Sequence, residues 1–169
     1  MIYTIYSDLI FYQVISFIKK YKNEQIYLYS YFYEMTKRKP TLIICLKDFI
    51  FFFVKPKDYF KCIDAKDKIR RETSFKKKIQ IISEEKVFIK LLFRLFPDLY
   101  IHDIKLEINN NSGQREISLY FLTYKERGVA IGRGGSYIRI INELIERYIM
   151  FENNGKPIEI KCKAIKAEI

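Results

Sequence analysis

The sequence of 169 residues is poor in the residue types that build metal, disulfide and catalytic sites. It has no tryptophan, one histidine (His102) and three isolated cysteines (Cys45, Cys62 and Cys162) with no CxxC pair. These spacings exclude the usual zinc motifs, and an odd number of isolated cysteines favours reduced, buried thiols over disulfides. No Ser/His/Asp set or carboxylate pair has a catalytic spacing, so we expect a non-enzymatic protein with no metal and no cofactor.

Long apolar runs are also missing. The run "FIFFFV" at 49–54 is six residues long and lies between Asp48 and Lys55, far short of the ~18 residues that a membrane span needs; it suits a buried strand. The N-terminal residues lack the charged-then-apolar order of a signal peptide. We therefore expect a protein that is neither membrane-bound nor secreted. Its location would be the cytoplasm or, since abundant Ile, Lys and Asn suggest an AT-rich gene, an organellar matrix or stroma.

Positive charge is abundant. The chain has 31 Lys/Arg against 20 Asp/Glu, a net charge of +11 and a pI near 9.4, with 49% hydrophobic residues. That hydrophobic fraction is enough for a packed core and argues against global disorder. A folded protein this basic usually binds an acidic partner, either nucleic acid or an anionic membrane face. The excess is concentrated in residues 1–84, which hold 17 Lys/Arg and 9 Asp/Glu, against 14 and 11 in residues 85–169.

The second half of the sequence divides clearly into helices and strands. Apolar periodicity predicts helices at 84–98, 126–131 and 136–149, and alternation predicts strands at 99–108, 115–124 and 157–164. Turn residues occupy 109–113 and 153–156. In the helix over 136–149, one apolar face would consist of Ile138, Ile141, Leu144, Ile145 and Tyr148.

The first half shows the same order less clearly. We expect a helix over 7–21 with Ser7 as its N-cap, while the aromatic stretch 24–36 is ambiguous. Strands at 41–46, 49–54 and 77–82 and helical pieces at 56–62 and 69–76 complete this half. Both halves read α-β-β-α-α-β, which predicts an α+β fold of two units, 1–83 and 84–169, that pack without a flexible Pro/Gly-rich linker.

The stretch "AIGRGGSYI" at 130–138 holds three of the six glycines: Gly132, Gly134 and Gly135. Glycine has no Cβ, so another backbone can approach it closely. The N-terminus of the following helix favours a negative charge at the same place. The stretch lacks the Gly-Lys-Ser/Thr ending of a Walker A loop, and no dinucleotide-binding βαβ unit surrounds it. A sugar-phosphate backbone is therefore the ligand that this pattern favours.

The segment "VAIGRGGSYIRIINEL" resembles the signature of the KH family, and the α-β-β-α-α-β order is similar to its type II variant. In that family the GxxG loop clamps about four nucleotides of single-stranded RNA or DNA. Two such units in tandem resemble the RNA-binding core of the NusA family of transcription factors, especially its short archaeal form. The resemblance covers residues 41–164, and its specific part is 129–145.

The resemblance implies a set of RNA-binding residues. Arg133 would reach phosphate, Arg127 could assist, and Ile131 with Ile138 would form the apolar floor of a groove. Ser136 is predicted to cap the second helix, to donate to phosphate, or to do both. Tyr137 and Arg139 would lie either at the groove or simply in solvent. The complete set is Arg127, Ile131, Gly132, Arg133, Gly134, Gly135, Ser136, Tyr137 and Arg139.

The first unit departs from the family pattern. Where the GxxG loop should stand, residues 63–68 read "IDAKDK", with two aspartates and no glycine. These carboxylates would repel phosphate, so we interpret the first unit as a degenerate KH unit with a structural or protein-docking role. The basic runs at 37–39 and 76–78 could still contact phosphates without sequence preference. The aromatic run at 26–34 could stack on bases, although such runs more often form a sheet or a partner-facing surface.

By resemblance, the partners would be single-stranded RNA and RNA polymerase, and the role would be control of transcription elongation, pausing or termination. One alternative is a KH component of a small ribosomal subunit, possibly organellar, or of its assembly. A second alternative is a protein-interaction module that has lost RNA binding. No membrane and no small-molecule substrate are expected.

Overall fold

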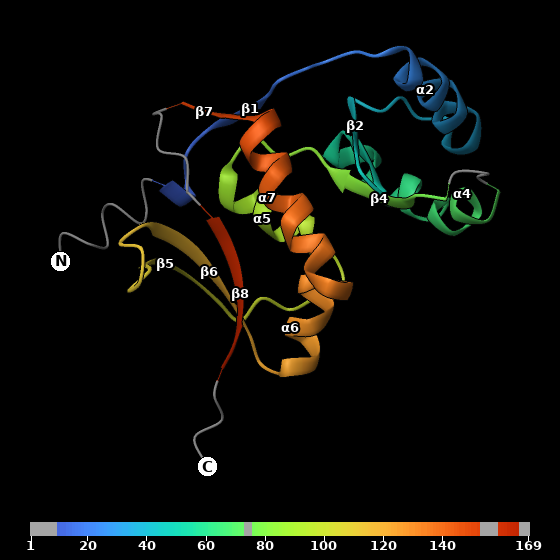
Figure 1. Ribbon diagram of the computed structural model, residues 1–169. Coiled ribbons are helices and arrows are strands. Elements are labelled where there is room, and N and C mark those ends of the chain that lie inside the picture. Colours follow the sequence, from blue (N-terminus) through green and yellow to red (C-terminus); the bar gives the residue numbers. More distant parts are fainter. Residues whose placement is uncertain (1–9, 73–75, 153–158, 166–169) are drawn as a thin grey trace. The chain divides into compact units, whose positions relative to one another are not determined.

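The computed structural model describes residues 10–72, 76–152 and 159–165, which form two compact units (Figure 1). The N-terminal unit consists of residues 18–85. The C-terminal unit combines residues 10–17 with the described residues from 86 onward. Each unit joins helices to a three-stranded sheet, so the fold is α+β, as predicted.

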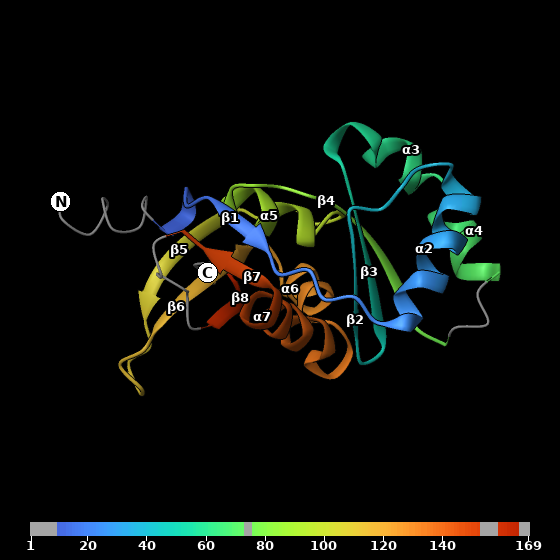
Figure 2. The same ribbon diagram turned by 90° about the horizontal axis from the view of Figure 1, so that it is seen from above.

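The N-terminal unit has the order α-β-β-α-α-β. Its sheet has the order β2-β3-β4, with β2 and β3 antiparallel and β3 and β4 parallel. A parallel pair needs a crossover connection, which the short helices provide on the side of the sheet that also carries α2 (Figure 2). The elements are α2 (Asn23–Thr36), β2 (Leu42–Leu46), β3 (Phe49–Val54), η1 (Pro56–Asp58), α3 (Tyr59–Ile63), α4 (Lys66–Glu72) and β4 (Lys78–Ser83).

The ambiguous aromatic stretch is a helix because its buried residues have helical spacing. Gln25, Leu28 and Phe32 of α2 face inward, at the i, i+3, i+7 positions of one helix face. The Phe32 ring stacks on that of Phe52 with 4.5 Å between centroids. The core of this unit also contains Ile43, Ile50, Val54, Cys62, Ile69, Ile79 and Ile81.

The C-terminal unit repeats this topology. Its sheet has the order β5-β6-β8, with β5 and β6 antiparallel and β6 and β8 parallel. Helices α5, α6 and α7 lie on one face of the sheet (Figure 1). The elements are α5 (Phe88–Leu95), β5 (Asp103–Ile108), β6 (Arg115–Phe121), α6 (Tyr124–Ile131), η2 (Arg133–Gly135), α7 (Ser136–Tyr148) and β8 (Glu159–Ala164).

The helix predicted over 7–21 is wrong. Residues 10 and 11 are helical, but β1 (Ile15–Phe17) pairs antiparallel with β7 (Ile149–Phe151) in the C-terminal unit. The Ile15 N–H donates to the Lys86 carbonyl at 2.8 Å, which ties this segment to the chain just before α5. Residues 10–17 therefore do not belong with the first unit as predicted. Ser7 and the turn predicted at 153–156 lie outside the described residues.

The three cysteines are free thiols. Burial raises the pKa of each of them, and that of Cys162 to about 12, so none is a reactive thiolate at neutral pH. Across the described ranges, none of the helices combines the length and the apolar character needed to cross a bilayer.

Candidate nucleic-acid interface

Helix α6 begins with a capping box. The Thr123 hydroxyl accepts from the Glu126 N–H at 3.1 Å, and the Glu126 carboxylate accepts from the Thr123 N–H at 3.1 Å. This reciprocal pair satisfies two backbone donors at the helix start. The helix therefore starts at Tyr124 rather than at residue 126 as predicted. The Thr-x-x-Glu spacing was the sequence signal for this start.

The glycine loop between α6 and α7 has a left-handed backbone. The φ angles of Gly132, Gly134 and Gly135 are 79°, 61° and 72°, a region that strongly favours glycine. A Cβ on Gly132 would lie 2.7 Å from the Tyr137 Cβ, whereas one on Gly134 would meet no atom within 4 Å. Gly132 therefore lets the chain pass close to the start of α7, and Gly134 leaves the backbone open on its outer side.

A groove of about 290 Å³ runs between the two helices and strand β8, which is an edge strand of the sheet. Half-buried Ile131 and Ile138 form apolar walls, and Arg127 and Arg139 also line the groove. The structure thus brings these four residues together, as expected for Ile131 and Ile138; for Arg139 the groove was one of the two positions considered, and for Arg127 a role beside the phosphate was one possibility. Asn142 of α7 and, on the opposite side, residues 159–163 complete the lining.

Tyr137 does not lie at this groove. Its side chain is only 9% exposed and its hydroxyl donates to the Leu95 carbonyl. Its ring lies edge-on to Phe96 at 5.7 Å, and burial raises its pKa. Both positions considered for Tyr137, groove and solvent, are therefore wrong. The buried face of α7 is rotated from the predicted one: it includes Tyr137 and Ile140, while Ile138 turns toward the groove.

Ser136 is not the N-cap of α7. That position is held by Gly135, and the Ser136 side chain makes no capping hydrogen bond. Its hydroxyl oxygen is buried and has no hydrogen-bond partner among the described residues. In this structure the hydroxyl is therefore covered, and it is not presented to a phosphate.

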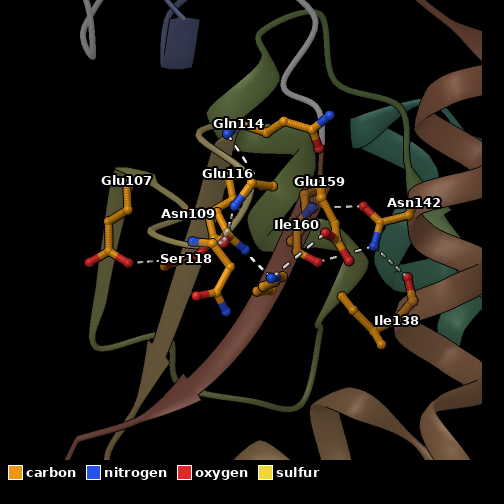
Figure 3. A network of polar contacts seen from close by, with 12 residues as sticks. Glu107, Asn109, Gln114, Glu116, Ser118, Ile138, Asn142, Glu159 and Ile160 are labelled. Atoms are coloured by element: carbon orange, nitrogen blue, oxygen red, sulfur yellow. Dashed lines mark hydrogen bonds and ion pairs between the residues drawn. The ribbon is translucent and has the colours of Figure 1, made fainter.

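Side-chain hydrogen bonds tie strand β8 to both helices, and Figure 3 shows those between Asn142 of α7 and Ile160. The Ile160 N–H donates to Asn142 Oδ1 at 2.7 Å, and Asn142 Nδ2 donates to the Ile160 carbonyl at 3.0 Å. Arg127 Nε donates to the Cys162 carbonyl at 2.9 Å. These bonds fix the distance between strand β8 and the two helices, and so the width of the groove. The role of Asn142 was not predicted from the sequence. Its only sequence signal is that a polar residue stands next to the apolar positions of the helix.

The lysines of β8 are already neutralised. Lys163 Nζ lies 2.6 Å from a Glu107 oxygen and 2.9 Å from a Glu116 oxygen, and Lys161 Nζ lies 2.9 Å from the other Glu116 oxygen. Burial opposes ionisation of Glu107, but hydrogen bonds from Lys163, Tyr120 and Ser118 outweigh it and lower its pKa to about 2. For Lys163 burial likewise opposes the charge, and the same carboxylates outweigh it, raising the pKa to about 12.

Among the described residues, Arg133 and Arg139 form no ion pair, so these arginines supply the positive charge of the site. Arg133 and Arg139 are exposed, and one terminal nitrogen of Arg139 would lie 3.7 Å from a Cβ on Gly135. The two guanidinium groups therefore stand at the glycine loop, one from η2 and one from the first turn of α7.

A second hollow lies next to the groove. It shares Arg127, Cys162 and Lys163 with the groove and reaches His102, Tyr120 and Tyr124.

The corresponding link in the N-terminal unit is an ordinary turn. Asp64 follows α3 with φ −63° and ψ −28°, a right-handed helical conformation. Asp67, in the first turn of α4, lies 4.0 Å from the Arg70 guanidinium. Arg70 also donates to the Ile79 carbonyl of edge strand β4 at 3.5 Å. This link therefore presents carboxylates where the other unit presents bare backbone.

No family model matches the sequence, and no curated protein matches it. Among solved structures, the fold is similar to that in the crystal structure of APE1850, with a TM-score of 0.58 and 16% sequence identity. The match covers 84% of this chain and 99% of that chain. A likeness at this level of identity concerns the fold alone.

Proposed function

We propose that the chain is a tandem type II KH protein of NusA-like type, whose C-terminal unit holds single-stranded RNA. The observation that carries this proposal is the glycine loop with its three left-handed residues, next to the groove lined by Ile131 and Ile138. The α-β-β-α-α-β order, with one antiparallel and one parallel strand pair in each sheet, supports it.

In this proposal the phosphates and the bases occupy different parts of the site. The sugar-phosphate backbone rests on the loop at Gly134, where no side chain intervenes, and Arg133 and Arg139 neutralise its charge. The positive end of the α7 dipole adds to this attraction. The bases turn into the groove against Ile131 and Ile138. Because phosphate contacts dominate such binding, the affinity falls steeply with salt.

The N-terminal unit is the degenerate partner in this proposal. Its helix–helix link has an ordinary backbone and carries Asp64 and Asp67. A phosphate placed there would meet like charge and no open glycine backbone. The unit therefore does not clamp RNA at this link.

The cellular role follows from the resemblance to the NusA family: control of elongation, pausing or termination beside RNA polymerase. Affinity capture of the tagged chain from its source cells separates this role from a ribosomal one. Recovery of polymerase subunits supports transcription. Co-sedimentation with small ribosomal subunits alone contradicts it.

The decisive variant carries Arg133→Asp and Gly134→Asp. Asp tolerates the left-handed conformation at position 134 better than most residues, and the space around that position is open. We expect binding of a fluorescent, unstructured RNA to fall at least tenfold, while the thermal midpoint falls by only a few degrees because position 134 has a positive φ. Anisotropy titration and a thermal melt measure the two quantities.

A charge-matched control carries Lys90→Asp and Asn110→Asp, two exposed positions outside the groove. Both variants change the net charge by −3, so a general electrostatic effect would weaken them equally. We expect the control to bind much better than the loop variant. Equal binding by the wild type and the loop variant would reject the loop as the RNA contact.

A further inference from the structure

Helix α2 of the N-terminal unit is apolar on its solvent side as well as its buried side. Tyr21 before the helix is 75% exposed, and Ile26 and Tyr29 on it are 66% and 38% exposed. Ile26, Tyr29 and Tyr33 follow the i, i+3, i+7 spacing of a single stripe. A helix on the surface of a globular domain normally shows polar residues there, so this stripe indicates a binding surface.

Two residues of this stripe, Ile26 and Tyr29, form one wall of a pocket of about 410 Å³, together with Tyr21. The other wall is the start of β2, the outer strand of its sheet, where Thr41 and Leu42 line the pocket. The pocket is held in shape by Gln25, whose Nε2 donates to the Ile43 carbonyl at 2.9 Å and whose Oε1 accepts from the Lys22 N–H at 2.9 Å. It is therefore a preformed cavity with flat aromatic rings and a few polar groups.

Charge around the pocket selects the kind of partner. None of its described lining residues is acidic, and Glu24 of α2 lies 3.8 Å from Lys77 instead. Exposed Lys20 and Lys22 flank Tyr21 in the chain, and exposed Lys39 precedes the lining residue Pro40. The whole unit, residues 18–85, holds 17 Lys/Arg against 9 Asp/Glu, a net charge of +8. Most of the protein's positive charge is thus on the unit that lacks the glycine loop.

We propose that α2 and the start of β2 form a second nucleic-acid site, which takes an unpaired base by stacking on Tyr21 and Tyr29. Exposed aromatic rings interleaved with lysines are the usual platform for single strands, because every base has a flat face. Ser30 and Thr41 line the same pocket. The Thr41 hydroxyl donates to the Phe53 carbonyl at 3.1 Å, so toward a base edge it can only accept. This site uses no residue of the glycine loop, but it binds the same class of ligand as the site proposed there, a single-stranded nucleic acid.

The test compares two double variants of the full chain. Tyr21→Leu with Tyr29→Leu keeps the pocket apolar but removes the flat rings, whereas Tyr21→Phe with Tyr29→Phe keeps them. With a fluorescent oligouridylate of about 20 nucleotides, we expect the Leu pair to weaken binding about tenfold and the Phe pair to leave it nearly unchanged. Tyr27→Leu is the matched control, because Tyr27 is 60% exposed on the same helix but outside the pocket.

Ultraviolet crosslinking of 4-thiouridine RNA supplies a direct readout, with crosslinked peptides expected to contain Tyr21 or Tyr29. Equal RNA affinity of the Leu pair and the wild type overturns the proposal. That result would instead fit a pocket that takes an apolar protein segment, which does not need flat rings. Loss of binding in the Leu pair with no loss in the Arg133→Asp, Gly134→Asp variant supports this site and rejects the loop. Loss in the loop variant alone rejects this site and supports the loop.

Discussion

The side chain of Asn142 on α7 pairs with the backbone of Ile160 on β8 as a neighbouring strand would, with one hydrogen bond to the N–H and one to the carbonyl. An edge strand otherwise leaves these groups without a strand partner. Asn142 Nδ2 also donates to the Ile138 carbonyl at 3.1 Å. One amide therefore fixes the distance between the helix and the strand that form the groove.

Asn142→Ala removes this bracing. We expect the free energy of unfolding to fall by about 1–3 kcal/mol, because the Ile160 backbone groups lose their partners. Hydrogen exchange at the Ile160 amide should accelerate accordingly. Asn110→Ala, at an exposed turn position, should change neither quantity. Unchanged exchange at Ile160 would contradict the role given to Asn142.

Three glycines of one segment should respond differently to alanine. Gly132→Ala forces a Cβ to 2.7 Å from that of Tyr137 at a positive φ, and should cost about 2–4 kcal/mol. Gly134→Ala meets open space and should cost about 1 kcal/mol, from its backbone alone. Gly128 lies inside α6, and a Cβ there would meet no atom within 4 Å. Gly128→Ala should therefore raise the free energy of unfolding by about 0.5–1 kcal/mol. Urea unfolding measures this order; any other ranking contradicts the loop geometry.

Tyr137→Phe tests whether this residue belongs to the core or to the groove. Loss of the hydrogen bond to the Leu95 carbonyl should lower the free energy of unfolding by about 1–2 kcal/mol, with RNA affinity unchanged. Since burial raises the Tyr137 pKa, the folded state favours the neutral phenol. Its contribution is complete below the unfolded pKa of about 10 and declines at higher pH. A weaker RNA affinity at an unchanged melting temperature would show that the Tyr137 hydroxyl contacts RNA and would contradict its place in the core.

Glu107→Gln tests the ion-pair network on the outer face of the sheet. The Glu107 pKa is lowered from 4.5 to about 2, so its contribution is complete above pH 4.5 and is lost as the pH falls toward 2. We expect the variant to be less stable at pH 7 by on the order of 2 kcal/mol, with the difference vanishing near pH 2. Glu159→Gln is the control, because that carboxylate is half exposed and 3.8 Å from Lys161. A pH-independent difference between wild type and Glu107→Gln would contradict the pairing.

The salt dependence of RNA binding should distinguish the arginines from the lysines. Arg133→Gln and Arg139→Gln should each reduce the slope of log affinity against log salt by about 0.7, as expected for one phosphate contact to a single strand. Lys161→Gln should leave the slope unchanged, because this lysine already contacts Glu116 at 2.9 Å. Equal slope changes for all three variants would show that the lysine reaches phosphate.

The elements with strong local patterns were predictable. The strands at 41–46 and 49–54 and the helix at 136–149 correspond to β2, β3 and α7 within a few residues. The two strands are short, continuous apolar runs that are buried almost throughout, and the helix has apolar residues at helical spacing. The position of the glycine loop was predictable for the same local reason, since only glycine adopts its backbone readily. The N-terminal helix was not, because pairing of β1 with β7 involves residues more than a hundred positions away.

By itself, then, the sequence determined the α-β-β-α-α-β order of the second half, the positive charge and the bare loop at 132–135, which are properties of neighbouring residues. The tertiary structure alone decided which side chains of that region are available to a ligand. It buried Tyr137 against Leu95, covered the Ser136 hydroxyl and matched Lys163 with Glu107 across two strands. A small rotation of a helix or the register of a sheet sets these outcomes, and both depend on packing between segments far apart in the chain.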